Sequence, residues 1–169
     1  MQAAYLKIVA ICALLWPIFA LAQEKPPAPE PAHYKLTFRL MQANSDGKIT
    51  NSRIYSIIVA ATGGSQRLQS IRTGDRIPAA NNYIDVGTNI DTNDIRLTDH
   101  ALGLRVDVES SSALKTDTAG NSLPLVRRTT WGSQVVVPLD KPTIIFTADN
   151  VSDTGKTELE LTATELKQP

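Results

Sequence analysis

The residues best suited to catalysis in this chain of 169 residues are two histidines, His33 and His100. His100 follows Asp99, and a Ser-His-Asp hydrolase needs a histidine that is braced by a carboxylate and contacts a serine. Adjacent residues on a strand or turn usually point apart, and the sequence contains no G-x-S-x-G nucleophile elbow. We therefore interpret His100 as a surface turn residue and expect no enzymatic activity. A hydrolase that uses His100 is an alternative, which the substitution His100→Ala would test.

Oxygen-bearing side chains gather in one short segment, at Asp91, Asn93, Asp94 and Asp99. Oxygen-rich loops can hold calcium. This segment lacks the glycine and the distal glutamate of an EF-hand loop. Asp and Asn are also common in turns, because their side chains bond to the local backbone. The pattern favours a turn, and we expect no cofactor; weak calcium binding at these four residues is the alternative.

Three residues could form a binding surface, namely Trp131 and the basic pair Arg127 and Arg128. A tryptophan in a strand is also a common packing partner in a core. Asp107 and Glu109 would share one face of a strand, as the paired carboxylates of a glycosidase could. That face alternates with apolar residues and should be solvated, so we do not expect either carboxylate to act as a catalytic acid.

The N-terminus predicts export. Lys7 precedes an apolar run over residues 8–21, which Pro17 interrupts, and Ala20-Leu21-Ala22 places small residues where a signal peptidase cleaves. A membrane anchor is the alternative, but such a run is shorter than the roughly 20 apolar residues that span a bilayer. We expect residues 1–22 to be a cleaved signal peptide. No transmembrane segment would then remain, and the protein would be periplasmic or secreted.

The composition of the chain argues against several kinds of bond and binding partner. The single cysteine, Cys12, lies in the expected signal peptide, so the mature chain would have no disulfide and no thiolate metal site. The chain carries 17 cationic and 17 anionic residues, which are scattered singly. Nucleic-acid binding needs a basic face, so we expect no nucleic-acid partner. Residues 23–33 hold four prolines and predict an extended tether.

The rest of the chain, residues 34–166, alternates between apolar and polar residues in short runs. Such alternation is typical of half-buried strands. The runs are separated by turn sequences such as Asn44-Ser45-Asp46-Gly47 and residues 62–65. Apart from Ser56, residues 55–60 are apolar, and this run predicts burial on both faces. Gly87 within a strand predicts a bulge or a close backbone approach. We expect a single all-β domain, an antiparallel β-sandwich or curled sheet, with strands at residues 34–40, 48–61, 66–73, 82–90, 102–109, 126–137, 143–148 and 157–163.

From residue 82 onward the order of elements resembles the core β module of bacterial secretins, the outer-membrane pore proteins of type II and type III secretion and type IV pilus systems. Val86-Gly87 and Ile90 match its first strand, and an alternating strand that ends in Glu109-Ser110 matches its second. The later matches are Pro124, Arg128, Thr130, Val135 and Val137, then the turn at residues 140–142 and the strand at residues 143–146.

The chain also departs from the secretin pattern. Asp140-Lys141-Pro142 stands where secretins usually carry Asp-Gly, and Ala148-Asp149-Asn150 replaces a glycine-rich element. The resemblance implies the fold and a cell-envelope setting, and we do not expect channel activity. The leading hypothesis is a non-catalytic exported β-sandwich that binds a protein partner in the envelope, accessory to a secretion or pilus apparatus. The alternative is a small-molecule, carbohydrate or calcium-binding β-sandwich.

Overall fold

The computed structural model describes residues 31–61, 68–79, 82–114, 125–150 and 154–167. Contacts divide the chain into two units, Met1–Glu30 and Pro31–Pro169, and every described strand lies in the second. The expected signal peptide and most of the expected tether therefore lie outside the described residues, as does the expected turn at residues 62–65. Because Pro31–Pro169 holds the whole described core, we expect residues 23–169 to fold on their own.

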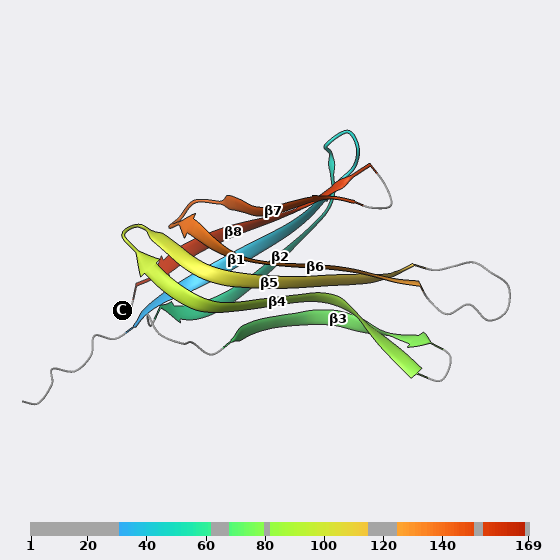
Figure 1. Cartoon of the computed structure of the whole chain (residues 1–169), viewed down its shortest axis with the longest axis horizontal. Coiled ribbons are helices and arrows are strands. Elements are labelled where there is room, and N and C mark those ends of the chain that lie inside the picture. Colours follow the sequence, from blue (N-terminus) through green and yellow to red (C-terminus); the bar gives the residue numbers. More distant parts are fainter. Residues whose placement is uncertain (1–30, 62–67, 80–81, 115–124, 151–153, 168–169) are drawn as a thin grey trace, which may run out of the picture. The chain divides into compact units, whose positions relative to one another are not determined.

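The described residues form eight antiparallel strands, which confirms the predicted all-β class (Figure 1). Sheet A has the order β2-β1-β8-β7, and sheet B has the order β3-β4-β5-β6. Most neighbouring strands are joined by hairpins, and the pairing of β1 with β8 alone brings together distant parts of the chain. The strands are β1 (Ala32–Ala43), β2 (Ile49–Ala61), β3 (Gln69–Ala79), β4 (Asn82–Thr98), β5 (Ala101–Leu114), β6 (Leu125–Pro138), β7 (Thr143–Asp149) and β8 (Lys156–Leu166).

The core lies between the two sheets, because one face of each sheet is apolar. Alternation on the central strands places every second side chain inside the sandwich. Both sheets contribute to one continuous cluster of buried residues. Sheet A supplies Tyr34, Leu36, Phe38, Val59, Leu159 and Leu161, and sheet B supplies Ile90, Ile95, Leu102, Leu104, Val106 and Val137.

Two predicted turns are confirmed. In the β1–β2 turn Gly47 has a positive φ of 76°, and its N–H donates to the carbonyl of Asn44 at 3.0 Å. Between β6 and β7 the chain passes from one sheet to the other at Leu139 and Asp140. The N–H of Leu139 donates to the carbonyl of His100 at 3.1 Å, and the N–H of Asp140 donates to that of Ala163 at 2.8 Å. These two bonds tie sheet B to sheet A at one end of the sandwich.

The expected burial of β2 on both faces was wrong. Ile54 is 66% exposed and Ile58 is 58% exposed, while Val59 on the other face is buried. The reason is that the core lies between the two sheets, so the opposite face of β2, which carries Ile54 and Ile58, points to solvent. A mainly apolar run therefore did not indicate burial on both faces here.

Several element boundaries also differ from expectation, among them the ends of β3, β4 and β5 and the start of β1. β3 does not end at Gly74 but continues through Pro78, which is tolerated because β3 is an edge strand. β4 continues past Ile90 to Thr98. His33, which was expected in the tether, lies in β1 opposite Ala60 and Leu166.

Gly87 makes the close backbone approach that the sequence predicts. It stands opposite Gly74 in the β3–β4 pair and has φ 155°, a conformation that residues with a side chain rarely adopt. A Cβ atom on Gly87 would collide with the backbone of Thr73 and Gly74. The two glycines therefore let β3 and β4 approach each other.

The buried hydroxyl of Tyr34 leads to a prediction about the stability of the core. Its side chain is fully buried, and its hydroxyl has no hydrogen-bond partner among the described residues. We expect Tyr34→Phe to leave the free energy of unfolding at neutral pH unchanged or to raise it by about 1 kcal/mol, because an unsatisfied buried hydroxyl costs stability. Urea denaturation of residues 23–169 would measure the difference. The exposed Tyr83→Phe is the control, and a clear loss of stability in Tyr34→Phe would contradict the assignment.

Tyr34 should also make stability fall at alkaline pH. Burial raises the pKa of Tyr34, and the nearby Glu165 carboxylate raises this pKa further. A tyrosine in the unfolded chain ionises near about pH 10. The contribution of the neutral Tyr34 phenol to the free energy of unfolding is therefore fully present below that pH. It is lost as the pH rises through the higher folded-state pKa. Denaturation midpoints above pH 10 should fall less steeply in Tyr34→Phe than in the unsubstituted domain.

Candidate functional site

The structure separates the three predicted binding residues. Arg127 and Trp131 lie on the face of β6 that points between the sheets, where Val135 and Val137 extend the core. Arg128 lies on the opposite face, where its Nε is 3.5 Å from a carboxylate oxygen of Glu109. The alternation of a strand explains this result, because adjacent residues point to opposite faces.

Arg127 and Trp131 line a cavity of about 440 Å³ between the ends of the two sheets, which we call the end cavity. Its volume is in the range of small-molecule sites, roughly 300–1,000 Å³. The apolar part of the described lining consists of Leu40, Ala43, Val108, Trp131, Phe146 and Leu159. Ten further lining residues carry hydroxyl or amide side chains, among them Gln42, Ser110, Ser112, Thr129, Asn150 and Thr157.

The end cavity forms where four strands change from apolar to polar inner residues at the same level. Gln42 follows Leu40 on β1, Ser110 follows Val108 on β5, Thr129 precedes Trp131 on β6 and Thr157 precedes Leu159 on β8. Without apolar side chains to fill the space, the sheets separate toward the end that carries the β1–β2 turn (Figure 1). The cavity therefore results from the change from apolar to polar side chains at the inner positions of these four strands.

Two aromatic rings from different sheets meet at the end cavity. Trp131 of β6 and Phe146 of β7 have ring centroids 5.1 Å apart and an interplanar angle of 42°. Tilted pairs at this distance attract each other beyond their simple area of contact. At the rim, the hydroxyl of Thr157 donates to Oδ1 of Asn150 at 2.9 Å. The cavity thus combines an apolar aromatic floor with a rim that offers hydrogen bonds.

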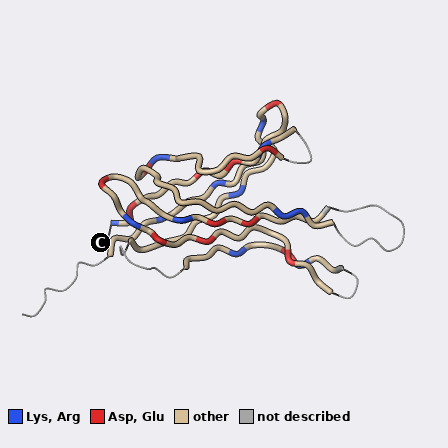
Figure 2. Tube along the Cα trace, viewed as in Figure 1, with Lys and Arg blue, Asp and Glu red and all other residues tan. Residues whose placement is uncertain are grey.

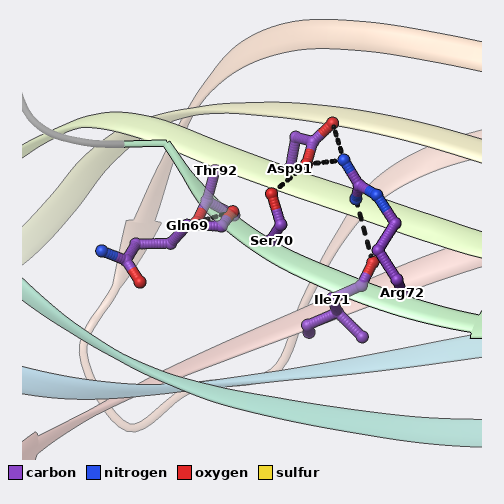
Figure 3. A network of polar contacts seen from close by, with 6 residues as sticks. All are labelled: Gln69, Ser70, Ile71, Arg72, Asp91 and Thr92. Atoms are coloured by element: carbon purple, nitrogen blue, oxygen red, sulfur yellow. Dashed lines mark hydrogen bonds and ion pairs between the residues drawn. The ribbon is translucent and has the colours of Figure 1, made fainter.

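The predicted turn at Asp91, Asn93 and Asp94 was wrong, since these three residues lie within β4. Asp91 faces outward from sheet B and accepts a hydrogen bond from the Ser70 hydroxyl at 2.7 Å (Figure 3). It also forms an ion pair of 2.7 Å with Arg72 of β3. Asp91 therefore joins β3 to β4 through side chains, in addition to the backbone ladder.

The other three oxygen-bearing residues have separate environments. Asp94 has φ 51° at an irregularity in the β4–β5 pairing and forms an ion pair of 2.7 Å with Arg96. Asn93 is opposite Arg105. Asp99 has φ 44° and is exposed in the β4–β5 turn, as expected. Within the described residues no three acidic, histidine or cysteine side chains form a group that could hold a metal ion, and weak calcium binding stays an alternative.

The outer face of sheet B carries charges in matched pairs. Arg105 donates two hydrogen bonds to Asp107, at 2.9 and 3.0 Å, and Arg76 forms an ion pair of 3.0 Å with Asp85. Figure 2 shows acidic and basic residues interleaved along these strands rather than gathered in one patch. Both carboxylates that could have served a glycosidase, Asp107 and Glu109, are paired with arginines on this face.

Among the edges of the described strands, that of β2 has the fewest protective features. β2 contains no proline and one charged residue, Arg53, over its 13 residues. The edge of β3 carries Arg72, Asp75, Arg76 and Pro78, β6 carries two arginines and ends at Pro138, and β7 is short. Proteins usually protect exposed edges with charges, prolines or short strands, because unpaired backbone groups attract further strands. The edge of β2 is therefore suited to pairing with another chain.

Comparison with known structures relates this sandwich to one group of proteins. No family model and no curated protein matches the sequence. The type II secretin GspD of enteropathogenic Escherichia coli has a TM-score of 0.56, with 7% identity over 99% of this chain and 75% of that one. The fold is secretin-like. The match covers 99% of this chain, whereas the sequence resemblance begins only at residue 82.

Two further structures share this secretin-like fold. The first is a chain of the Klebsiella pneumoniae type II secretion system outer membrane complex of PulD, PulS and the PulC HR domain. Its TM-score to this chain is 0.55, with 8% identity, and the match covers 100% of this chain and 44% of the other. The type II secretion system secretin GspD of E. coli K12 has a TM-score of 0.53, with 12% identity over 99% and 54%. The secretin-like chain thus spans about half the length of these two proteins. None of its described residues forms a helix of the length and apolarity that crossing a membrane requires.

Sequence reasoning identified two residues of the end cavity and missed the others. The sequence pattern places Phe146 in an ordinary strand, whereas its contact with Trp131 depends on the pairing of β7 with β8. The missed signal was the polar replacement at inner positions such as Ser110 and Thr129, which continue the alternation of apolar residues. No sequence signal predicts the edge position of β2, because local alternation of apolar and polar residues does not determine the order of strands in a sheet.

Proposed function

We propose that this chain is a non-catalytic exported protein that binds another protein in the cell envelope, as an accessory to a secretion or pilus apparatus. The secretin-like fold is the observation that supports it most, because one of the similar structures is an outer membrane complex of several proteins. The signal-peptide pattern of residues 1–22 supports export, to the periplasm or beyond.

The proposed mode of binding is the addition of a strand from the partner to the edge of β2. In this mode backbone hydrogen bonds supply affinity and alternate side chains supply specificity. Ile54 and Ile58 lie two positions either side of Ser56, so they share the exposed face of β2. They would be covered by side chains of the added strand. The partner segment is thus an extended, partly apolar stretch of an envelope protein.

Cross-linking in the host tests the proposed role. A tagged copy of the full chain, treated with formaldehyde in intact cells, should be recovered with a component of a secretion or pilus complex of the outer membrane. An unrelated exported protein with the same tag is the control. Recovery of no envelope protein beyond those found with the control would contradict the proposal.

Light scattering tests whether the chain acts as an accessory or assembles by itself. Residues 23–169, separated by size-exclusion chromatography, should elute as a monomer or another small species, with and without calcium. A large homo-oligomer of discrete size would contradict the accessory role, because the chain would then form an assembly of its own.

A further inference from the structure

The end cavity has a lining that selects among classes of small molecule. Its described lining combines the aromatic pair Trp131 and Phe146 with ten hydroxyl or amide side chains. A purely apolar ligand would cover these polar groups without bonding them, and each buried group left unpaired costs about 1–3 kcal/mol. A ligand for this cavity must therefore present many hydrogen-bonding groups together with an apolar surface.

Charge restricts the ligand further. Arg127 is the one cationic side chain that the described residues contribute to the lining, and they contribute no carboxylate. Phosphate groups are usually held by several cationic or backbone donors, so a phosphorylated ligand fits this lining poorly. A saccharide matches it, because a sugar ring has an apolar face that can stack on an aromatic side chain and hydroxyls around its edge.

We infer that the end cavity is a saccharide-binding site, in which a sugar ring packs against Trp131 and its hydroxyls bond to the rim, including Ser112 and Thr129. Both rim residues are exposed, so they can be reached without movement of the core. Ile54 and Ile58 are not among the described lining residues. The inference is therefore independent of binding at the edge of β2, and either can fail without the other.

Titration calorimetry and fluorescence on residues 23–169 test the inference. Trp131 is the only tryptophan in these residues, so its emission reports on the cavity directly. The probes are cellobiose, N,N′-diacetylchitobiose and digalacturonate at millimolar concentrations, with decanoate and an extended alanine-rich peptide for comparison. We expect saturable binding of at least one saccharide, accompanied by a change in Trp131 emission.

Variants locate the bound saccharide. Trp131→Phe and Thr129→Val should each weaken binding about fivefold, because a ring stack or a hydrogen bond contributes about 1 kcal/mol. Arg128→Gln is the matched control, since Arg128 lies on the opposite face of the same strand and should leave binding unchanged. Thermal unfolding checks that each variant is folded. Binding of none of the three saccharides, preferential binding of decanoate or the peptide, or equal affinity in all variants would overturn the inference.

Discussion

Replacing Gly87 by alanine should destabilise the domain by about 3 kcal/mol, the largest effect that we expect from a single methyl group in this protein. Two causes act together. The φ of 155° disfavours any side chain, and the new Cβ atom would meet the backbone of Thr73 and Gly74. Backbone atoms cannot move aside as a flexible side chain can, so β3 and β4 would have to separate. Urea denaturation of residues 23–169 would measure the change.

Gly103→Ala is the matched control for this prediction. Gly103 is also a strand glycine of sheet B, but the nearest atom that a Cβ at this position would meet is the carbonyl oxygen of Arg96 at 3.7 Å, an ordinary contact. We expect its stability to change by less than about 0.5 kcal/mol. Equal stability of the two variants would show that β3 and β4 do not approach as closely as the structure has them.

Placing lysines at Ile54 and Ile58 should lower partner binding at least about tenfold, which corresponds to about 1.4 kcal/mol. Lysines on a strand edge oppose pairing with another strand. Both side chains are more than half exposed, so the double substitution should change stability little. The yield of the cross-linked envelope complex in the host, compared with the unsubstituted chain at equal expression, would measure the effect.

Ile144→Lys supplies the control for the β2 edge. Ile144 is 54% exposed and lies on β7, at the other edge of sheet A. This substitution adds a lysine without touching β2, so the cross-linked yield should be unchanged. If Ile144→Lys reduced the yield as much as the double substitution did, the partner would not be selecting the edge of β2.

The all-β class and the number of strands could be predicted from sequence because they depend on local alternation. The run from Leu102 to Val108 alternates strictly, and its apolar members are buried or partly buried as expected. The β1–β2 turn was predictable for the same reason, since Gly47 supplies the positive φ that the turn needs. Local chemistry determines both features.

Features that depend on strand order could not be predicted in this way. Ile54 and Ile58 have the sequence pattern of core residues, but the packing of the two sheets leaves their face of β2 on the outside of the sandwich. The carboxylate of Asp91 has the pattern of a turn residue or metal ligand, but the β3–β4 register places Arg72 and Ser70 beside it. Likewise the sequence identifies Trp131 as a candidate, but its neighbour Phe146 reaches it from the other sheet.

Residue-resolved photo-cross-linking tests the central proposal, that the chain binds an envelope protein through the edge of β2, most directly. A photoreactive benzoylphenylalanine would replace Ser56, which lies between Ile54 and Ile58 on the exposed face of β2. The control position is Gln134, which is exposed on sheet B. In intact cells of the host, we predict that position 56 forms an adduct with a component of a secretion or pilus complex, and that position 134 forms little or none. The adduct at position 56 should be lost when Ile54 and Ile58 are replaced by lysines. Equal adducts from both positions, an adduct with a second copy of this chain, or none from position 56 would contradict the account.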